Sequence, residues 1–411
     1  MKFNPFRPGK AVTPDLFAGR VAQLIEINKS LSQTKHSNAM HFVTYGERGI
    51  GKSSLLDAAA AAATGDQVEH LDSYDFLVVP VGLTQRDDDL SIVRKVGARL
   101  ERELAKRKKV EELLKSTWSL LKRIEVAGTG LKDKGTDNSP IVDPVGDLAR
   151  IMAEALADLG DKVDGILVLF DEADPAAPAL GRVAKQLVDS LGDERCDRVC
   201  LGVAGMPGVI SGMREGHESA PRIFEPLPLE VMNREESNQI VHKGLAEVQS
   251  KVGTVITIQD DALLAIAGNS NGYPQFVQQI ASSAYEADSD FNITLDDVFH
   301  GMFSTGGAID ALGAKHFQVP YFDLIKSDEY RAVLFVMADS GDGYVAKDAI
   351  RQTTNLKETT LSNPLHALKD RGIIQAHPAK RGEYRLSSRA FALYIKLASR
   401  GREHLRETNA A

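Results

Sequence analysis

Eight consecutive residues of this chain, Gly46 to Ser53, have the types and the spacing that bind phosphate. Their sequence is Gly-Glu-Arg-Gly-Ile-Gly-Lys-Ser, which matches the pattern Gly-x-x-x-x-Gly-Lys-Ser. The apolar stretch Met40 to Tyr45 predicts a strand before them, and Ser54 to Ala63 predicts a helix after them. A glycine-rich loop in this position turns its N–H groups toward an anion, and the helix dipole adds to the attraction. We therefore predict a phosphate-binding loop rather than a turn without a ligand.

The last residues of the loop have separate predicted roles. Lys52 is expected to reach the β- and γ-phosphates of a nucleotide. Ser53 is expected to offer its hydroxyl to the Mg²⁺ ion that bridges the same oxygens. The residues predicted to line the phosphates are Gly46, Glu47, Arg48, Gly49, Ile50, Gly51, Lys52, Ser53 and Ser54.

A second segment carries the acidic groups that nucleotide hydrolysis needs. Residues 165–172, Gly-Ile-Leu-Val-Leu-Phe-Asp-Glu, form a continuous apolar run that is typical of a buried parallel strand and ends in two carboxylates. Following a phosphate-binding loop, this is a Walker B pattern. Asp171 is predicted to hold Mg²⁺, and Glu172 to orient and polarise the attacking water. The alternative is two acidic residues in an ordinary surface loop.

Composition indicates a globular intracellular protein. The 411 residues are 43% hydrophobic and 26% charged, which favours two or three domains. No apolar stretch approaches membrane-spanning length, and Met1 to Gly9 is not a secretory signal, so we expect a cytoplasmic protein without a membrane partner. Cys196 and Cys200 lack further ligands for a metal site and are expected to be thiols in a reducing compartment.

Strands and helices alternate along the first part of the chain. A helix is predicted from about Asp89, where apolar residues recur every fourth position. Further strands are predicted at Phe76 to Val81, Ile166 to Phe170, Val199 to Val203 and about Ile223 to Leu229. This order predicts an α/β fold, a P-loop NTPase with a parallel sheet and helices on both faces. Lys106 to Pro144 is predicted to be an insertion whose basic stretch is a solvated helix face rather than a nucleic-acid contact.

Several other segments resemble AAA+ and STAND-type ATPases of the archaeal ATPase and Orc/Cdc6 kind, over nearly the whole chain. These segments are Asn4-Pro5-Phe6, Phe17-Ala18-Gly19-Arg20, Ala204-Gly205-Met206-Pro207, Arg222-Ile223-Phe224 and Gly272-Tyr273-Pro274-Gln275-Phe276-Val277-Gln278. The resemblance implies ATP as the nucleotide, an ATPase core at residues 1–231 with the insertion at about 106–144, and a helical lid at 232–310.

The resemblance also implies roles for residues outside the loop. In such proteins the N-terminal box and the lid enclose the adenine base, so the implied nucleotide neighbours are Phe17, Gly19, Arg20, Tyr273 and Pro274. Arg222 resembles the arginine that senses or completes the γ-phosphate site; the alternative is an arginine that caps a loop before a strand. The chain departs from the family where many AAA+ proteins place a polar γ-phosphate sensor, because this strand ends in Val203, Ala204 and Gly205. Slow or conditional hydrolysis is therefore expected.

The C-terminal residues predict a winged-helix domain at 320–411. Three helices are expected, from Asp328, at Val345 to Thr353, and around Leu361 to Leu368, where Pro364 is expected to shorten the third helix. A hairpin follows, with strands at Ile373 to Ala376 and Glu383 to Leu386.

This C-terminal part is basic in an otherwise acidic protein. From Lys326 onward there are 15 Lys and Arg against 10 Asp and Glu, a net charge of +5 in a chain whose total is −8. That polarity suits double-stranded DNA. The residues predicted to contact DNA are Lys357, Thr359, Thr360, Lys369, Lys380 and Arg381. The alternative is a winged helix that contacts protein or holds the ATPase closed.

Two functions therefore follow from the sequence. The first is a Mg²⁺-dependent ATPase that binds ATP and ADP, assembles into a homo-oligomer and acts on or near DNA through its winged helix. The second is a nucleotide-gated switch that binds a protein effector, as in STAND proteins of signalling or antiviral defence. Salt-dependent binding to duplex DNA distinguishes them.

Overall fold

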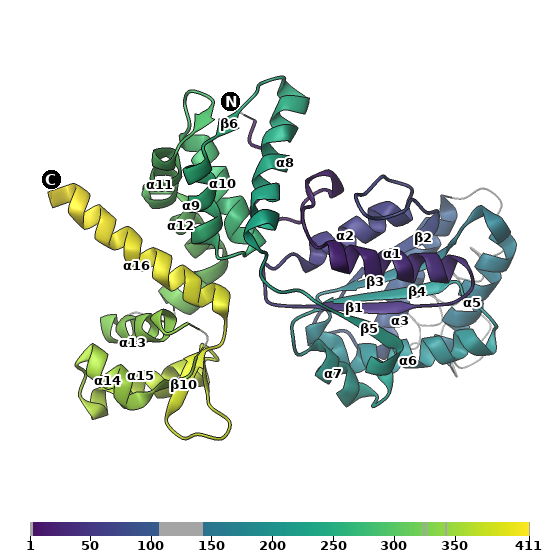
Figure 1. Ribbon diagram of the computed structural model, residues 1–411. Helices are drawn as coiled ribbons and strands as arrows, with labels where there is room; N and C mark the ends of the chain where they lie inside the picture. Colours follow the sequence, from purple (N-terminus) through teal and green to yellow (C-terminus); the bar gives the residue numbers. More distant parts are fainter. Residues whose placement is uncertain (1–2, 107–142, 324, 326, 342, 411) are drawn as a thin grey trace, which may run out of the picture. The chain divides into compact units, whose positions relative to one another are not determined.

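The computed structural model describes residues 3–106, 143–323, 325, 327–341 and 343–410. The chain forms two compact units (Figure 1). The core unit comprises Ala11–Gly46 and Gly51–Glu230, and the lid unit comprises Met1–Lys10, Glu47–Ile50 and Val231–Ala411. The predicted insertion lies outside the described residues except at its two ends. The domain boundaries at 231, 310 and 320 stay predictions.

A five-stranded parallel sheet with the order β2-β3-β4-β1-β5 forms the centre of the core unit. The strands are β1 His41–Tyr45, β2 Phe76–Gly82, β3 Gly165–Asp171, β4 Val199–Gly205 and β5 Phe224–Pro228. All five predicted strands are confirmed. Tyr45 pairs with Gly205, and Phe170 pairs with Val203, so the carboxyl ends of β1, β4 and β3 lie side by side. The phosphate-binding loop and the acidic pair both follow strands that end at this edge.

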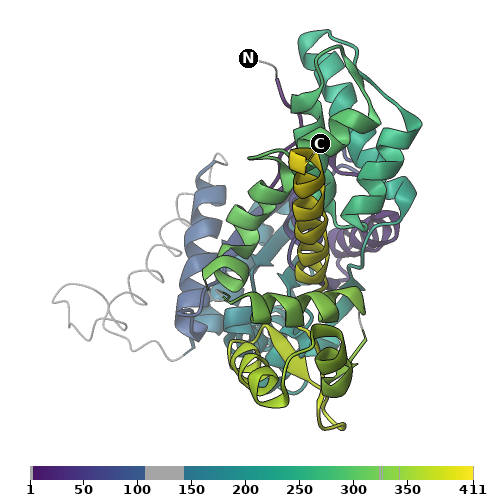
Figure 2. The same cartoon turned by 90° about the vertical axis from the view of Figure 1, so that its left-hand side faces the viewer.

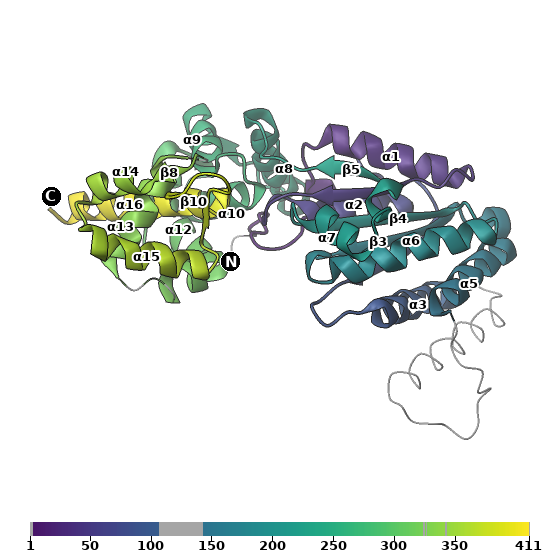
Figure 3. The same ribbon diagram turned by 90° about the horizontal axis from the view of Figure 1, so that it is seen from below.

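Helices cover both faces of the sheet, which confirms the predicted α/β fold class (Figures 1 and 3). One face carries α1 Val21–Lys35 and α2 Lys52–Ala63, and the other carries α3 Asp89–Ala105, α5 Pro144–Leu159 and α6 Ala177–Asp193. The remaining elements among the described residues of the unit are α7 Val209–Gly216 and short 3₁₀ helices at Pro14–Leu16, Gly160–Lys162, Asp174–Ala176 and Ala220–Ile223.

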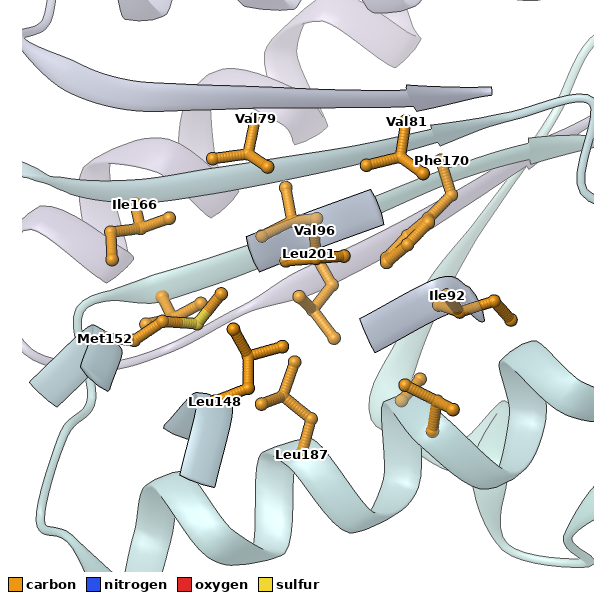
Figure 4. Packing of buried hydrophobic residues seen from close by; sticks show 14 of the residues in the cluster. Val79, Val81, Ile92, Val96, Leu148, Met152, Ile166, Phe170, Leu187 and Leu201 are labelled. Carbon is orange, nitrogen blue, oxygen red and sulfur yellow. The ribbon is translucent and has the colours of Figure 1, made fainter. Parts of the chain in front are cut away.

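Apolar side chains fill the space between the sheet and α3, α5 and α6 (Figure 4). Val79, Val96, Leu148, Leu187 and Leu201 are at most 1% exposed. Complete burial of a side chain of this size contributes about 1.5–3 kcal/mol relative to exposure. The sheet edge that carries the chemical groups is thus supported by a continuous core.

The sequence of α3 explains both where it starts and which face it buries. Its N-cap Asp88 accepts the N–H of Ser91 at 2.9 Å, and Oγ of Ser91 accepts the N–H of Asp88 at 2.7 Å. This reciprocal pair satisfies N–H groups that a helix start leaves without partners. The predicted four-residue repeat is confirmed, because the following side chains are all 0% exposed: Ile92, Val96, Leu100 and Leu104.

The lid unit begins with a bundle of helices. They are α8 Arg234–Val252, α9 Asp260–Ser270, α10 Pro274–Ala287, α11 Leu295–Phe303 and α12 Ala308–Leu312, with short parallel strands β6 Thr257–Ile258 and β7 Asn292–Ile293. The N-terminal segment is attached to this bundle, since Nδ2 of Asn4 donates to Oε1 of Glu286 at 2.9 Å and Arg7 pairs with Glu247 at 3.1 Å. A π-helical segment, η5 Gly313–Asp323, follows α12.

The predicted winged helix is also confirmed. It consists of α13 Asp328–Asp339, β8 Val345–Ala346, α14 Lys347–Thr354, α15 Glu358–Asp370, β9 Ile374–Ala376, β10 Glu383–Leu386 and α16 Arg389–Ala410. The three strands form an antiparallel sheet in the order β8-β10-β9. Figure 2 shows α16, which packs on α13 and also contacts α11 and α12. Phe317 joins the two parts, because its ring lies 4.6 Å from Tyr394 and 5.4 Å from Phe391.

Two details of the sequence prediction are wrong. The second helix starts at Lys347 rather than Val345, because Val345 and Ala346 pair with β10 as a strand. Pro364 does not shorten the third helix, which continues through it to Asp370. Proline removes one helical hydrogen bond, but the helix is held by three leucines that are at most 3% exposed: Leu361, Leu365 and Leu368.

Two further observations concern the cysteines and the hydrophobicity of the helices. Cys200 is buried in β4, Cys196 is half-buried, and both are free thiols; burial raises the pKa of Cys200 to about 12. Among the residues that the structure describes, no helix is long and apolar enough to cross a membrane.

Candidate functional site

The phosphate-binding loop follows a backbone path that requires glycine at two positions. Gly49 has a φ of 79° and Gly51 a φ of 104°, both in the left-handed region that side chains disfavour. A Cβ on Gly49 would also lie 2.1 Å from Oε1 of Gln275, within the lid unit. The spacing of these glycines in the sequence therefore has a conformational reason.

The helix after the loop presents its N-terminus to it. α2 begins at Lys52, directly after Gly51. The first N–H groups of a helix have no acceptor within it and carry the positive end of the dipole, which together favour a phosphate. Oγ of Ser54 accepts the N–H of Val12 at 3.2 Å, which attaches the N-terminal segment of the core unit to the start of α2.

Lys52 lies over the loop. Its Nζ donates to the carbonyl oxygen of Gly46 at 2.8 Å and lies 3.9 Å from Sδ of Met206. The side chain is half-buried. An ammonium held here can exchange its carbonyl partner for phosphate oxygens, which bind it more strongly because they are charged.

The two acidic residues differ in their environment. Asp171 ends β3 and its Oδ1 accepts the N–H of Glu172 at 2.8 Å. Glu172 is exposed and has a φ of 53°, a left-handed conformation that costs a non-glycine residue about 1–3 kcal/mol. The strand thus ends in a sharp turn that leaves the Glu172 carboxylate open to water, as a water-orienting group requires.

Asp57 indicates which face of α2 is directed toward the acidic strand end. Burial, and then the charge of Asp171, raise the pKa of Asp57. Ser53 and Asp57 are four residues apart and share a helix face. Ser53 therefore lies on the same face of α2 as Asp57. The Ser53 hydroxyl and the Asp171 carboxylate are hard oxygen groups of the kind that Mg²⁺ accepts beside phosphate and water, so their types suit the predicted magnesium pair.

In the part of the chain that the structure describes, no all-protein metal site competes with this pair. Among the described residues, no group of three or more His, Cys, Asp and Glu side chains is arranged to hold a metal ion. Mg²⁺ in nucleotide sites is usually bound by one or two protein groups, with the phosphates and water completing its shell.

The end of β4 carries no polar side chain, as the sequence indicated, and the packing explains why. β4 lies between β1 and β3, so its end separates the phosphate-binding loop from the acidic pair. Val203, Ala204 and Gly205 are all buried. A Cβ on Gly205 would lie 2.6 Å from the side chain of Val209. A polar sensor at this glycine would therefore require α7 to repack.

Arg222 lies at the amino ends of the strands, whereas the loop of its own chain lies at their carboxyl ends. It is exposed, in the 3₁₀ helix that precedes β5. β5 is parallel to β1, with Phe224 beside His41 and Pro228 beside Tyr45. Four strand steps of about 3.3 Å, or about 13 Å, separate these two pairs. Arg222 is thus remote from the phosphates that its own loop would hold.

The implied neighbours of the nucleotide base fall in two groups. Phe17 and Arg20 are buried in the core unit, and the helix Pro14–Leu16 just before them packs against α2. Gly19 and Arg20 have φ of 67° and 61°, and Arg20 is the N-cap of α1. In the lid unit Pro274 begins α10 and Tyr273 is 2% exposed.

Glu47 makes contacts that its place in a motif did not predict. Within the lid unit its Oε2 accepts the hydroxyl of Tyr273 at 3.1 Å and the backbone N–H of Arg389 at 3.2 Å. Arg389 is the first residue of α16, so a carboxylate of the phosphate-binding loop lies at the positive end of a winged-helix element. Arg48, in the same loop, is exposed. Burial is the main cause that lowers the pKa of His316, and the charge of Arg48 lowers it further.

The predicted DNA contacts occupy two places in the winged helix. Lys357 is the exposed N-cap of α15, Thr359 and Thr360 lie in its first turn, and Lys369 is exposed in its last turn. Lys357 and Lys369 are separated by about 18 Å of helix. The connection between β9 and β10 exposes Lys380 and Arg381.

A histidine organises that connection. Nδ1 of His377 accepts the N–H groups of Ala379 at 3.0 Å and Lys380 at 2.9 Å, and Lys380 forms an exposed ion pair with Glu383 at 3.7 Å. The tip of the hairpin thus has a defined backbone turn.

Comparison with known proteins reveals a shared fold. No family model and no curated protein sequence matches this chain. The Walker-type ATPase PABY2304 of Pyrococcus abyssi is similar in structure at 16% identity, with a TM-score of 0.51 over 95% of this chain and 98% of that one. ORC2 of Aeropyrum pernix, solved with ADPNP and ADP, matches at 16% identity and a TM-score of 0.49 over 94% of each chain. Cdc6p of Pyrobaculum aerophilum matches at 13% identity and a TM-score of 0.44 over 98% of each chain. The first of these confirms the predicted resemblance at the level of the fold.

Proposed function

We propose that this protein is a Mg²⁺-dependent ATPase that binds ATP at Gly46 to Ser53 and releases ADP. The observation that supports it most is the strand order. The loop on β1 and the acidic pair on β3 reach one sheet edge, where Lys52 and Glu172 are positioned on either side of the end of β4. The shared fold with a Walker-type ATPase supports the same reading.

The residues divide the chemistry between them. Bound Mg²⁺ would neutralise phosphate charge, with Ser53 and Asp171 as its protein ligands. Lys52 would bind the β- and γ-phosphate oxygens, and Glu172 would orient the attacking water and take up its proton. Since β4 offers no polar sensor, we expect turnover to be slow or to depend on a partner.

The test of nucleotide binding is Lys52→Ala. Loss of a charge-assisted contact of about 2 kcal/mol or more should weaken ATP binding at least about 30-fold, measured by calorimetry with Mg²⁺ present. Lys162→Ala, an exposed lysine of the same unit, is the matched control and should bind as the wild type does. Equal affinity in the Lys52 variant would exclude this site.

We further propose that the protein acts as a homo-oligomer in which Arg222 serves the γ-phosphate of a neighbouring copy. Its exposure and its distance from its own loop support a role between copies. A mixing experiment tests this. Arg222→Ala and Glu172→Gln should each be nearly inactive alone, and their mixture should recover part of the activity, because some interfaces then join an intact arginine to an intact glutamate. No recovery in a mixture that assembles normally would argue against it.

We propose duplex DNA as the partner of the winged helix. The support is the net charge of +5 from Lys326 onward and the exposure of Lys380 and Arg381 on a hairpin with a defined turn. For the domains we retain an ATPase core at 1–231, a lid at 232–310 and a winged helix at 320–411. Phe17, Gly19, Arg20, Tyr273 and Pro274 remain the proposed neighbours of the base.

A nucleotide-gated switch that binds a protein effector is the second candidate, and the contact of Glu47 with α16 favours it. A loop carboxylate that bonds to the start of α16 can report nucleotide binding to the winged helix, since phosphate entering the loop repels it. In a switch, Glu47→Gln should raise basal turnover by weakening this contact. Unchanged turnover, together with salt-dependent DNA binding, would favour the first function.

A further inference from the structure

The end of β4 is bonded to both chemical segments beside it. The N–H of Gly46, the first loop residue, donates to the carbonyl oxygen of Gly205 at 3.2 Å. On the other side, the N–H of Ala173, which follows Glu172, donates to the carbonyl oxygen of Ala204 at 3.0 Å. The end of β4 thus sets the separation between the phosphate-binding loop and the acidic turn.

A third and stronger contact comes from a carboxylate that the proposed chemistry does not use. Both side-chain oxygens of Asp174 accept the backbone N–H of Met206, at 2.7 and 2.8 Å. Asp174 is half-buried and begins the 3₁₀ helix Asp174–Ala176, which leads into α6. A hydrogen bond to an ionised acceptor is roughly twice as strong as one between neutral groups.

The residue that Asp174 holds lies beside the phosphate-binding lysine. Sδ of Met206 lies 3.9 Å from Nζ of Lys52. Met206 directly follows Gly205, where a side chain is excluded by Val209. Position 205 therefore has no side chain that could link β4 to a γ-phosphate. Asp174 instead anchors the end of β4 to the acidic segment.

We propose that Asp174 is a positioning residue for ATP hydrolysis, which fixes the end of β4 and thereby the distance between Glu172 and Lys52. The proposal rests on the ATPase function proposed above. In this role Asp174 acts through the backbone N–H of Met206, which both of its side-chain oxygens accept.

This role has a kinetic signature that a general stabilising role lacks. ATP affinity depends mainly on the loop and on the N-terminus of α2, whereas the side-chain hydrogen bonds of Asp174 go to Met206. Attack by water depends on the placement of Glu172 relative to the γ-phosphate, and a displacement of about 1 Å can reduce rates about 100-fold. Loss of Asp174 should therefore lower kcat and leave the affinity for nucleotide nearly unchanged.

The experiment compares Asp174→Ala and Asp174→Asn with the wild type in the full-length protein. We expect kcat to fall at least tenfold in Asp174→Ala, with KM for ATP and Kd for ADP within about twofold. Asp174→Asn keeps one acceptor oxygen and should recover part of kcat. The matched control is Asp189→Asn, an aspartate of α6 whose ion pair with Lys185 lies within that helix; its kcat should equal that of the wild type.

Amide hydrogen exchange of Met206 provides a readout that does not need turnover. Its N–H should exchange slowly in the wild type and at least tenfold faster in Asp174→Ala. Fast exchange of Met206 in the wild type would overturn the proposal.

The possible results distinguish failure of the Asp174 role from failure of the proposed ATPase function. If the wild type hydrolyses ATP and Asp174→Ala has the same kcat, the role of Asp174 is overturned and the ATPase function stands. A parallel loss of kcat and ADP affinity would reduce Asp174 to a structural residue and overturn the proposal as well. A wild-type protein that binds ATP but hydrolyses none would remove the ATPase function, and the positioning role with it.

Discussion

His41 should make the core unit less stable as the pH falls from 7 to 5. The imidazole is 6% exposed at the start of β1, and its Nδ1 accepts the N–H of Leu201 in β4 at 3.1 Å. Burial lowers the pKa of His41 from 6.5 to about 4. Protonation in the folded state would both bury a charge and remove this acceptor.

The sign and size follow from the difference in pKa. The unfolded chain takes up a proton at His41 near pH 6.5, and the folded chain takes it up only near pH 4. Between these values the unfolded state binds more protons, so the stability of the fold decreases as the pH is lowered. With these two pKa values, the free energy of unfolding should drop by about 2 kcal/mol between pH 7 and pH 5.

Urea unfolding of the nucleotide-free protein at the two pH values measures this drop. In His41→Asn the amide oxygen takes the place of Nδ1 and does not titrate, so about 2 kcal/mol of the pH dependence should disappear whatever the stability at pH 7. His70→Asn, an exposed histidine of the same unit, should keep the wild-type pH dependence. The same pH dependence in His41→Asn and in the wild type would show that His41 titrates normally and that this reasoning is wrong.

Three other changes test the site and the winged helix. Glu172→Gln should keep its affinity for Mg-ATP and lose about 100-fold in turnover, since only water activation is removed; unchanged turnover in a steady-state assay would place the base elsewhere. Changing Lys380 and Arg381 together to Glu should weaken duplex binding for all sequences and flatten its dependence on salt, while ATP affinity stays constant; a wild type that binds no duplex at low salt would refute the DNA proposal. Gly205→Ala should lower the free energy of unfolding by about 1–3 kcal/mol through its clash with Val209, and Val209→Ala should relieve part of that loss in the double variant, whereas strict additivity would contradict the clash.

Local patterns allowed much of the fold to be predicted. A continuous apolar run such as Ile166 to Phe170 can only be a buried strand or a buried helix, and its length favours a strand. The four-residue repeat that starts at Ile92 fixes which face of α3 is buried. Gly49 and Gly51 adopt left-handed backbone angles, and the short motif that contains them is enough to predict this conformation. Such features depend on neighbours in the chain, so one sequence suffices to predict them.

Local reasoning fails where distant packing outweighs it. Pro364 stays inside a helix because buried leucines on both sides of it retain the helical backbone, although proline alone favours a break. Val345 joins a strand because Tyr384 is present to pair with it. The packing of those leucines against α13 and β9, and the pairing of Val345 with β10, involve segments elsewhere in the domain, so the residues around either position do not reveal them.

The sequence by itself determined the chemical groups and the order in which they occur: a loop with the phosphate-binding pattern, an acidic strand end and a basic winged helix. Only the tertiary structure decided how these groups are held. It places Arg222 at the amino ends of the strands, away from its own loop, brings Met206 to Asp174, and brings Arg389 to Glu47 across 342 positions. Side-chain type and spacing are properties of short segments, whereas these contacts depend on strand order and on packing between segments far apart in the chain.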